Sequence, residues 1–142
     1  MLGVEPSQRS NLSLNQPLRD AVILLAEDNA ANVLTIGEYL ESYGYNIVNA
    51  HDGLEAIAQA EETNPDLILM DIQMPVMDGL EAIRRLRADS RFVSTPIIAL
   101  TALAMTGDRE RCLAAGATEY LSKPVRLKTL LTTIQDFMKQ KK

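Results

Sequence analysis

The stretch from residue 66 to residue 79 constrains the fold of this chain more than any other. It reads Asp66-Leu67-Ile68-Leu69-Met70-Asp71, followed by Ile72-Gln73-Met74-Pro75-Val76-Met77-Asp78-Gly79. Consecutive apolar residues that end at a carboxylate are typical of a strand buried on both faces, as in the middle of a parallel sheet. Asp71 would then lie at the carboxyl end of that strand, where open α/β sheets form the crevice that contains their functional site. The Pro and Gly that follow predict a turn, with a helix beginning near Gly79.

Apolar runs of the same kind recur along the chain and alternate with amphipathic segments. Short apolar runs bounded by turn residues predict strands at 22–26, 45–50, 66–71, 96–101 and 118–122. Between and after them, helical spacing of apolar residues predicts helices, three of which cover about 79–88, 108–115 and 127–138. Gly116 is expected to end the second of these three helices.

The two earlier helices are predicted from their apolar spacing and their caps. The first is expected to carry residues 33, 36, 37 and 40 on its inner face, with Gly44 at its C-cap. The second is expected to begin at Asp52 as N-cap, with Glu55 at its third position. Its inner face is expected to hold Leu54, Ile57 and Ala58.

Five strands that are each followed by a helix predict one doubly wound α/β domain. Parallel strands need right-handed crossovers, which place helices on both faces of the sheet. The flavodoxin-like form of this architecture has the strand order 2-1-3-4-5. We expect the domain to span residues 21–142, and we expect residues 1–20, which are polar and show no period, to be a flexible extension or linker.

The composition excludes several classes of protein. The net charge is −5 and no basic stripe is present, which argues against direct binding of nucleic acid. No apolar run approaches the roughly 20 residues that span a bilayer, and the N-terminus does not resemble a secretion signal. The single cysteine allows no internal disulfide. We therefore expect a cytoplasmic domain that does not enter a membrane.

Polar residues gather where the predicted parallel strands end. Glu27 and Asp28 follow the first strand, Asp71 ends the third, Thr101 ends the fourth and Lys123 follows the fifth. Carboxylates that converge at one edge repel each other unless protons or a metal offset their charge, and hard oxygen ligands suit Mg²⁺ better than zinc. An acceptor carboxylate, a metal site, a cation and a hydroxyl are the groups that formation of an aspartyl phosphate requires.

Four blocks of sequence resemble the signature of the response regulator receiver domain. They are Ala26-Glu27-Asp28-Asn29-Ala30-Ala31-Asn32, Leu69 to Gly79, Ile98-Ala99-Leu100-Thr101-Ala102 and Tyr120-Leu121-Ser122-Lys123-Pro124. The resemblance covers about residues 22–138 and is highly specific, because the four blocks occur in order at the expected spacing. The Glu-Asp-Asn-x-x-Asn and Met-Pro-x-Met-Asp-Gly patterns are most similar to CheY-like receivers of hybrid sensor histidine kinases and phosphorelays.

The resemblance implies a role for each of these residues. Asp71 would be the phosphoacceptor, and Mg²⁺ would be held by Glu27, Asp28, Asp71 and the backbone carbonyl of Gln73. The longer side chain of Glu27, where many relatives have aspartate, leaves room for a water between carboxylate and metal. Thr101 would be the switch hydroxyl, Tyr120 the rotating aromatic residue and Lys123 the phosphate-binding cation. The Lys123-Pro124 peptide bond would be cis.

The implied function is phosphoacceptance in a two-component or phosphorelay system. The partner would be a sensor histidine kinase or a histidine phosphotransfer protein, with small-molecule phosphodonors as an alternative source. Phosphorylation would change the surface formed by the fourth helix, fifth strand and fifth helix. The chain would catalyse only its own phosphotransfer and dephosphorylation, so we do not expect an enzyme that acts on an external substrate.

Other interpretations explain the sequence less well. A flavodoxin-like nucleotide or flavin binder needs a first turn whose N–H groups cradle phosphate, and Glu27-Asp28 would repel that group. A phosphatase with a nucleophilic Asp commonly needs a second acid two residues later, where this chain has Gln73. The resemblance leaves open whether the chain is a stand-alone regulator or part of a hybrid kinase, and whether it forms a homodimer.

Overall fold

The five predicted strands form a single parallel sheet in the order β2-β1-β3-β4-β5. The computed structural model describes residues 21–102 and 107–140. The strands are β1 (Val22–Ala26), β2 (Asn46–Ala50), β3 (Leu67–Asp71), β4 (Ile97–Thr101) and β5 (Glu119–Ser122). The helices are α1 (Ala30–Glu41), α2 (Gly53–Thr63), α3 (Gly79–Arg87), α4 (Asp108–Ala115) and α5 (Leu127–Gln140), with a 3₁₀ turn at Ser90–Phe92. The predicted order of strands and helices, and the doubly wound architecture, are confirmed.

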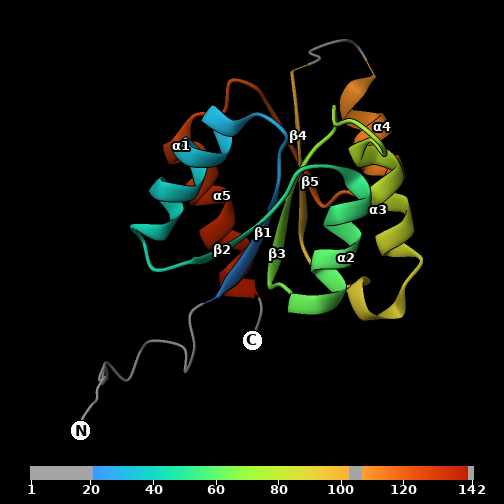
Figure 1. Cartoon of the computed structure of the whole chain (residues 1–142), viewed down its shortest axis with the longest axis horizontal. Coiled ribbons are helices and arrows are strands. Elements are labelled where there is room, and N and C mark those ends of the chain that lie inside the picture. The colour runs from blue at the N-terminus through green and yellow to red at the C-terminus, as the bar shows by residue number, and fades with distance from the viewer. Residues whose placement is uncertain (1–20, 103–106, 141–142) are drawn as a thin grey trace, which may run out of the picture.

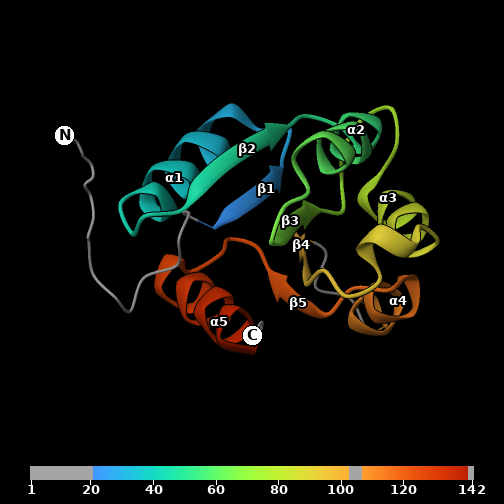
Figure 2. The same cartoon turned by 90° about the horizontal axis from the view of Figure 1, so that it is seen from below.

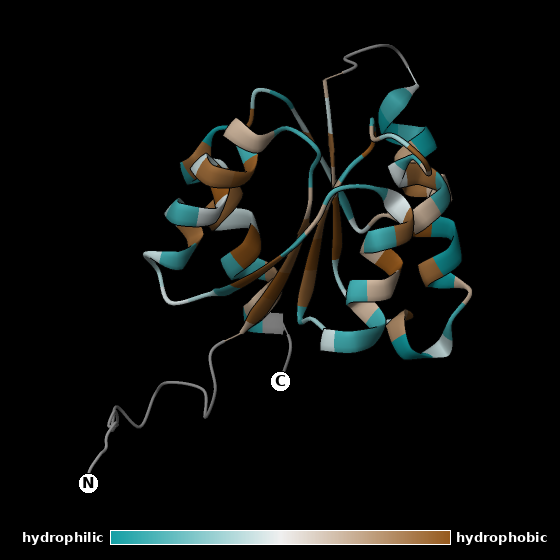
Figure 3. Cartoon of the chain, in the orientation of Figure 1, coloured by the Kyte–Doolittle hydropathy of each residue, from teal (hydrophilic) through white to brown (hydrophobic). Residues whose placement is uncertain are grey.

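Helices cover both faces of the sheet. Helices α1 and α5 lie on one face, and α2, α3 and α4 lie on the other (Figures 1 and 2). Each face has its own apolar core, because alternate residues of the central strands point to opposite sides. Leu67 and Leu69 of β3 belong to the core under α1 and α5, whereas Ile68 and Met70 belong to the other core. Apolar residues accordingly line the inner sides of the helices (Figure 3).

Strand β3 occupies the centre of the sheet, as its apolar run predicted. It pairs with β1 on one side and with β4 on the other, and all five of its residues are buried. Full burial of each Leu or Ile side chain contributes roughly 1.5–3 kcal/mol to stability. This packing holds the last residue of the strand, Asp71, at a defined point of the carboxyl edge.

Three helices begin at that same edge, each with a side chain as N-cap. Asn29, Asp52 and Asp78 each accept a hydrogen bond from the backbone N–H three residues later, at 3.0, 2.8 and 3.0 Å. Such caps satisfy backbone donors that have no partner inside the helix. The Asp52 cap was predicted, and the caps fix where the chain leaves the sheet edge and turns into α1, α2 and α3.

The prediction for the inner face of α2 was wrong in part. Leu54 is 50% exposed and Ala58 is exposed, whereas Gly53, Ala56 and Ala60 are buried. A Cβ atom at Gly53 would lie 2.4 Å from the carbonyl oxygen of Met77, so only a residue without a side chain fits there. The close approach of the loop before α3 therefore requires glycine at the start of the inner face of α2.

Two further details concern the ends of the chain and of α1. Helix α1 ends at Glu41 with Ser42 as its C-cap, and Gly44, predicted as the cap, lies in the following turn with φ of +94°.

Residues 1–20, predicted to be an extension or linker, lie outside the described residues. Within the part of the chain that the structure describes, no helix is long and apolar enough to cross a membrane.

Candidate phosphoacceptor site

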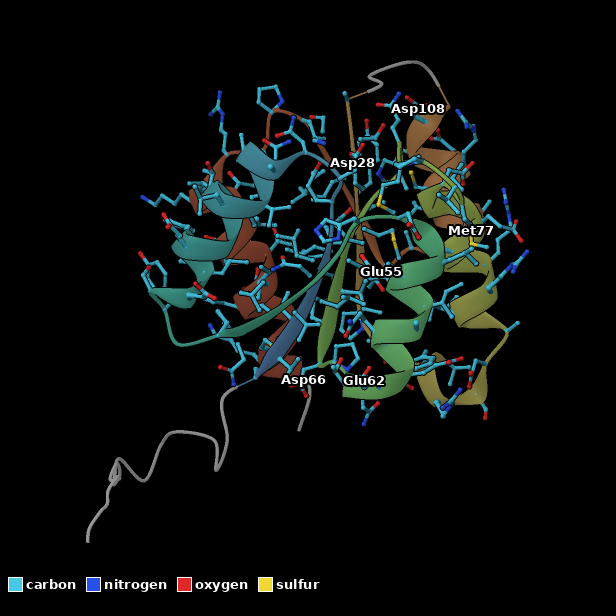
Figure 4. All side chains as sticks on the ribbon, viewed as in Figure 1. Asp28, Glu55, Glu62, Asp66, Met77 and Asp108 are labelled. Carbon is cyan, nitrogen blue, oxygen red and sulfur yellow. The ribbon has the colours of Figure 1, made fainter. Side chains whose placement is uncertain are left out.

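Three carboxylates converge at the carboxyl edge of the sheet. Asp71 ends β3, while Glu27 and Asp28 directly follow β1, the neighbouring strand. One carboxylate oxygen from each residue lies within 4.8 Å of the others. Glu27 and Asp71 are buried and Asp28 is exposed, which places the cluster at the surface of the edge, where Asp28 is labelled in Figure 4.

Lys123 links the two buried carboxylates. Its ammonium nitrogen Nζ lies 3.1 Å from Oε1 of Glu27 and 3.2 Å from Oδ2 of Asp71. The side chain is positioned from β5, since the backbone N–H of Lys123 donates to the carbonyl oxygen of Thr101 at 2.8 Å, and the peptide bond to Pro124 is cis. Burial would lower the pKa of Lys123, but hydrogen bonds and attraction from Glu27 and Asp71 outweigh it and raise that pKa. The ammonium group therefore stays charged.

The environment of Asp71 makes its ionised form costly. Burial raises its pKa from 3.8 to about 6, and this effect outweighs the hydrogen bond that the backbone N–H of Gln73 donates to Oδ1. The charge of Glu27 raises the pKa further, while Lys123 lowers it. A carboxylate with incomplete compensation for its charge is a site where added positive charge is strongly favoured.

The remaining predicted residues lie at different distances from this cluster. The register pairs Asp71 with Leu100, so the next residue, the buried Thr101, lies at the end of the adjacent strand. The backbone of Gln73 borders Asp71 through its N–H, while its side chain is exposed. Tyr120 lies farther along the sheet: it is half-buried, pairs in register with Ala99 and packs against the core under α2, α3 and α4.

The loop after Asp71 depends on backbone features that the sequence reasoning did not identify. A Cβ atom at Gly79 would lie 2.3 Å from the carbonyl oxygen of Asp71, so α3 can approach the site only with glycine there. Val76 has φ of +67°, and the backbone N–H of Met77, the next residue, donates to the carbonyl oxygen of Pro75, the preceding residue, at 2.7 Å. A β-branched residue in this region is strained. The glycine could have been found from the Met-Asp-Gly pattern, whereas nothing in the identity of a valine signals a positive φ.

The donor set suits a divalent cation that prefers oxygen. Three carboxylates within reach of one point supply hard ligands, and the group contains neither cysteine nor histidine. Such donors favour Mg²⁺ over zinc. The charge balance agrees, because three acids face the single ammonium group of Lys123 within this cluster of described residues.

Comparison with known proteins identifies the family. The model of the response regulator receiver domain matches residues 23–135. The polar-differentiation response regulator DivK of Brucella ovis is 40% identical over 116 residues, which cover 82% of this chain and 94% of that protein.

Solved structures give the same result. The receiver domain of the sensor histidine kinase PA1611 of Pseudomonas aeruginosa PAO1, which holds a magnesium ion in its active-site cleft, is 44% identical with a TM-score of 0.78. The match covers 83% of this chain and 97% of that one. CheY4 of Vibrio cholerae is 35% identical with the same TM-score, over 83% of this chain and 98% of its own. The chain belongs to the response regulator receiver domain family.

Proposed function

We propose that Asp71 accepts a phosphoryl group from a phosphohistidine of a sensor histidine kinase or a histidine phosphotransfer protein. The observation that carries the proposal is the bridge made by Lys123, which contacts both Asp71 and Glu27 at the edge where three carboxylates meet. Receiver domains act with such phosphohistidine proteins. The same edge would also accept the group from small-molecule phosphodonors.

The proposed reaction is a direct transfer to a carboxylate oxygen. An oxygen of ionised Asp71 attacks phosphorus, the phosphorus–nitrogen bond to histidine breaks and the imidazole leaves with the bonding electron pair. Gln73 holds the other oxygen of Asp71 in place through its N–H. Lys123 offers its charge to a phosphoryl oxygen as the new bond forms, and the hydroxyl of Thr101 donates to another.

Glu27, Asp28, Asp71 and the carbonyl of Gln73 would hold Mg²⁺, with Glu27 acting through a water. When bound, the cation neutralises charge that develops on the phosphoryl oxygens. The carboxylate of Glu27 accepts hydrogen bonds from the ammonium group of Lys123 and from the backbone N–H of Asn29, which donates to Oε2 at 3.1 Å.

The proposed output is a change at the surface of α4, β5 and α5. Phosphorylation adds charge and acceptor oxygens next to Thr101, which then moves toward the phosphoryl group. Tyr120 turns into the space that this movement opens. Two strands connect these residues, because β4 carries Thr101 and pairs with β5, which carries Tyr120. The surface thus has two states, and the phosphoryl group shifts the equilibrium between them only by the difference in its affinity for each state.

The proposal is tested by labelling the protein with phosphoramidate in the presence and absence of Mg²⁺, with mass spectrometry to locate the modification. We expect Mg²⁺-dependent phosphate on Asp71, none on Asp71→Asn, and unchanged labelling of Asp136→Asn. Asp136 is an exposed residue of α5 and serves as the matched control. Undiminished labelling of Asp71→Asn would overturn the assignment of the phosphoacceptor.

A second measurement tests the switch. Amide chemical shifts of the phosphorylated protein should change in β5 and α5 as well as beside Asp71, and Thr101→Val should remove the distant changes while labelling continues. Changes confined to the loop after Asp71 in the wild-type protein would contradict the switch. We further propose a cytoplasmic signalling domain that occupies residues 21–142 and has no external substrate.

A further inference from the structure

A second concave site lies at the opposite edge of the sheet from Asp71. A cavity of about 310 Å³ opens beside Pro96 and Thr118, which directly precede β4 and β5. Its walls include Arg87, the last residue of α3, and Phe137 of α5. In Figure 1 α3 and α5 lie on opposite faces of the sheet, and both end toward its lower end, where the strands begin.

Arg87 brings a positive charge to this cavity. Its guanidinium donates to the carbonyl oxygens of Gly116 and Phe92 and to the hydroxyl oxygen of Thr118. A guanidinium has five N–H donors, so two remain after these three bonds. Among the described residues Arg87 has no carboxylate partner, and burial lowers its pKa. A partly desolvated cation without an anionic partner attracts an anion.

Two hydroxyl groups add further donors. Thr95 is 7% exposed and lines the cavity, and its hydroxyl has no hydrogen-bond partner within residues 21–102 and 107–140. The hydroxyl oxygen of Thr118 accepts from the N–H of Ile97 at 3.0 Å and from Arg87 at 3.1 Å, which leaves its proton to donate. Among the residues that the structure describes, neither aspartate nor glutamate lines the cavity. The polar side of the cavity is thus built from donors.

Apart from the exposed Ser94, the rest of the wall is apolar. Val93, Pro96 and Phe137 line it, and Val93 is 59% exposed although it is a large apolar residue. We propose that this cavity binds a small organic anion. A carboxylate or phosphate head group meets the free donors of Arg87, Thr95 and Thr118, and an apolar body lies against Val93, Pro96 and Phe137. The volume fits a ligand of about the size of one aromatic ring with its acidic group, at the lower end of ligand cavities.

The test is a titration of the ¹⁵N-labelled protein with benzoate, without Mg²⁺ and at constant ionic strength. We expect saturable shifts at the amides of Thr95, Ile97 and Thr118. Benzamide, which has the same shape and no charge, should produce none. Saturable shifts of the same amides with inorganic phosphate would extend the site to phosphate head groups. Shifts that rise linearly, that are equal for benzamide, or that occur only at Asp71 and Gln73 would overturn the proposal.

A substitution at Thr95 separates binding from folding. Arg87 joins three backbone segments, so its replacement would disturb the fold, whereas Thr95→Val removes one hydroxyl and keeps the shape. We expect about tenfold weaker benzoate binding, because a hydrogen bond to a charged group is lost. Thr132→Val, a control on the exposed side of α5, should bind as the wild type does. Equal affinity for Thr95→Val and the wild type would refute the assigned head-group site.

Discussion

Replacement of Asp71 by asparagine should stabilise the protein when divalent cations are absent. The pKa of Asp71 is about 6 in the folded protein against an ordinary value of 3.8, so folding disfavours the ionised form. Below the lower value the carboxyl group is protonated in both states and contributes nothing. As the pH rises from the lower value to the folded value, the unfolded chain has already lost the proton that the folded protein keeps, and stability falls; above the folded value it levels off. Asparagine never ionises and avoids this cost.

The magnitude follows from the difference between the two pKa values. Each pKa unit corresponds to about 1.4 kcal/mol, which makes the cost of ionised Asp71 about 3 kcal/mol above the folded pKa. This value already includes the attraction of Lys123, because a pKa compares both protonation states in the same surroundings. Asparagine has one acceptor oxygen where the carboxylate has two, so Gln73 and Lys123 compete for it. We therefore expect a gain of about 2 kcal/mol at about pH 8.

Urea denaturation followed by circular dichroism measures this gain, since the chain contains no tryptophan to report by fluorescence. The experiment compares the wild type, Asp71→Asn and the exposed control Asp136→Asn in a chelator at several pH values. The advantage of Asp71→Asn should shrink as the pH falls below about 6 and be lost by about pH 4, and Mg²⁺ should reduce it by stabilising the wild type. An asparagine variant that is less stable than the wild type at the upper pH, or an advantage independent of pH, would refute the reasoning.

Three further predictions concern the loop and the cation of the site. Gly79→Ala should destabilise the protein by more than about 3 kcal/mol in urea denaturation, because the new Cβ atom would lie 2.3 Å from a backbone oxygen. The control Gly37→Ala, whose Cβ atom would have nothing within 4 Å, should raise the free energy of unfolding by about 0.5–1 kcal/mol. Equal effects of the two would contradict the close approach. Val76→Gly should raise stability by about 1 kcal/mol, because it relieves the backbone strain at φ of +67°. The control Val93→Gly, at a residue with φ of −65°, should lower stability. A loss of stability at both positions would count against strain at Val76. Lys123→Met should raise the affinity for Mg²⁺ measured by calorimetry, since it removes a cation that lies 3.2 Å from Asp71. The same substitution should slow labelling by phosphoramidate. Unchanged Mg²⁺ affinity would show that the ammonium group does not compete with the metal for the site.

The order of elements could be predicted because its signals are local. Apolar runs that end in acids located β1 and β3, and the Asp52 cap located the start of α2. The inner face of α2 could not be predicted in the same way, because the hydrophobicity of Leu54 favours burial, whereas the structure buries Gly53, where the backbone of Met77 leaves no room for a side chain, together with two alanines. Contacts with a distant segment, here the loop of Met77, overrode the local pattern.

Sequence alone determined which chemical groups meet at the edge, because parallel strands bring Glu27, Asp71 and Lys123 to the same side wherever the strands end. Only the tertiary structure decided what those groups experience. The hydrogen bonds of Lys123 to two acids and the raised pKa of Asp71 depend on distances and burial, as does the hydroxyl of Thr95, which has no partner within residues 21–102 and 107–140. Distances and burial come from packing between segments far apart in the chain, and electrostatic energies vary steeply with distance and with burial.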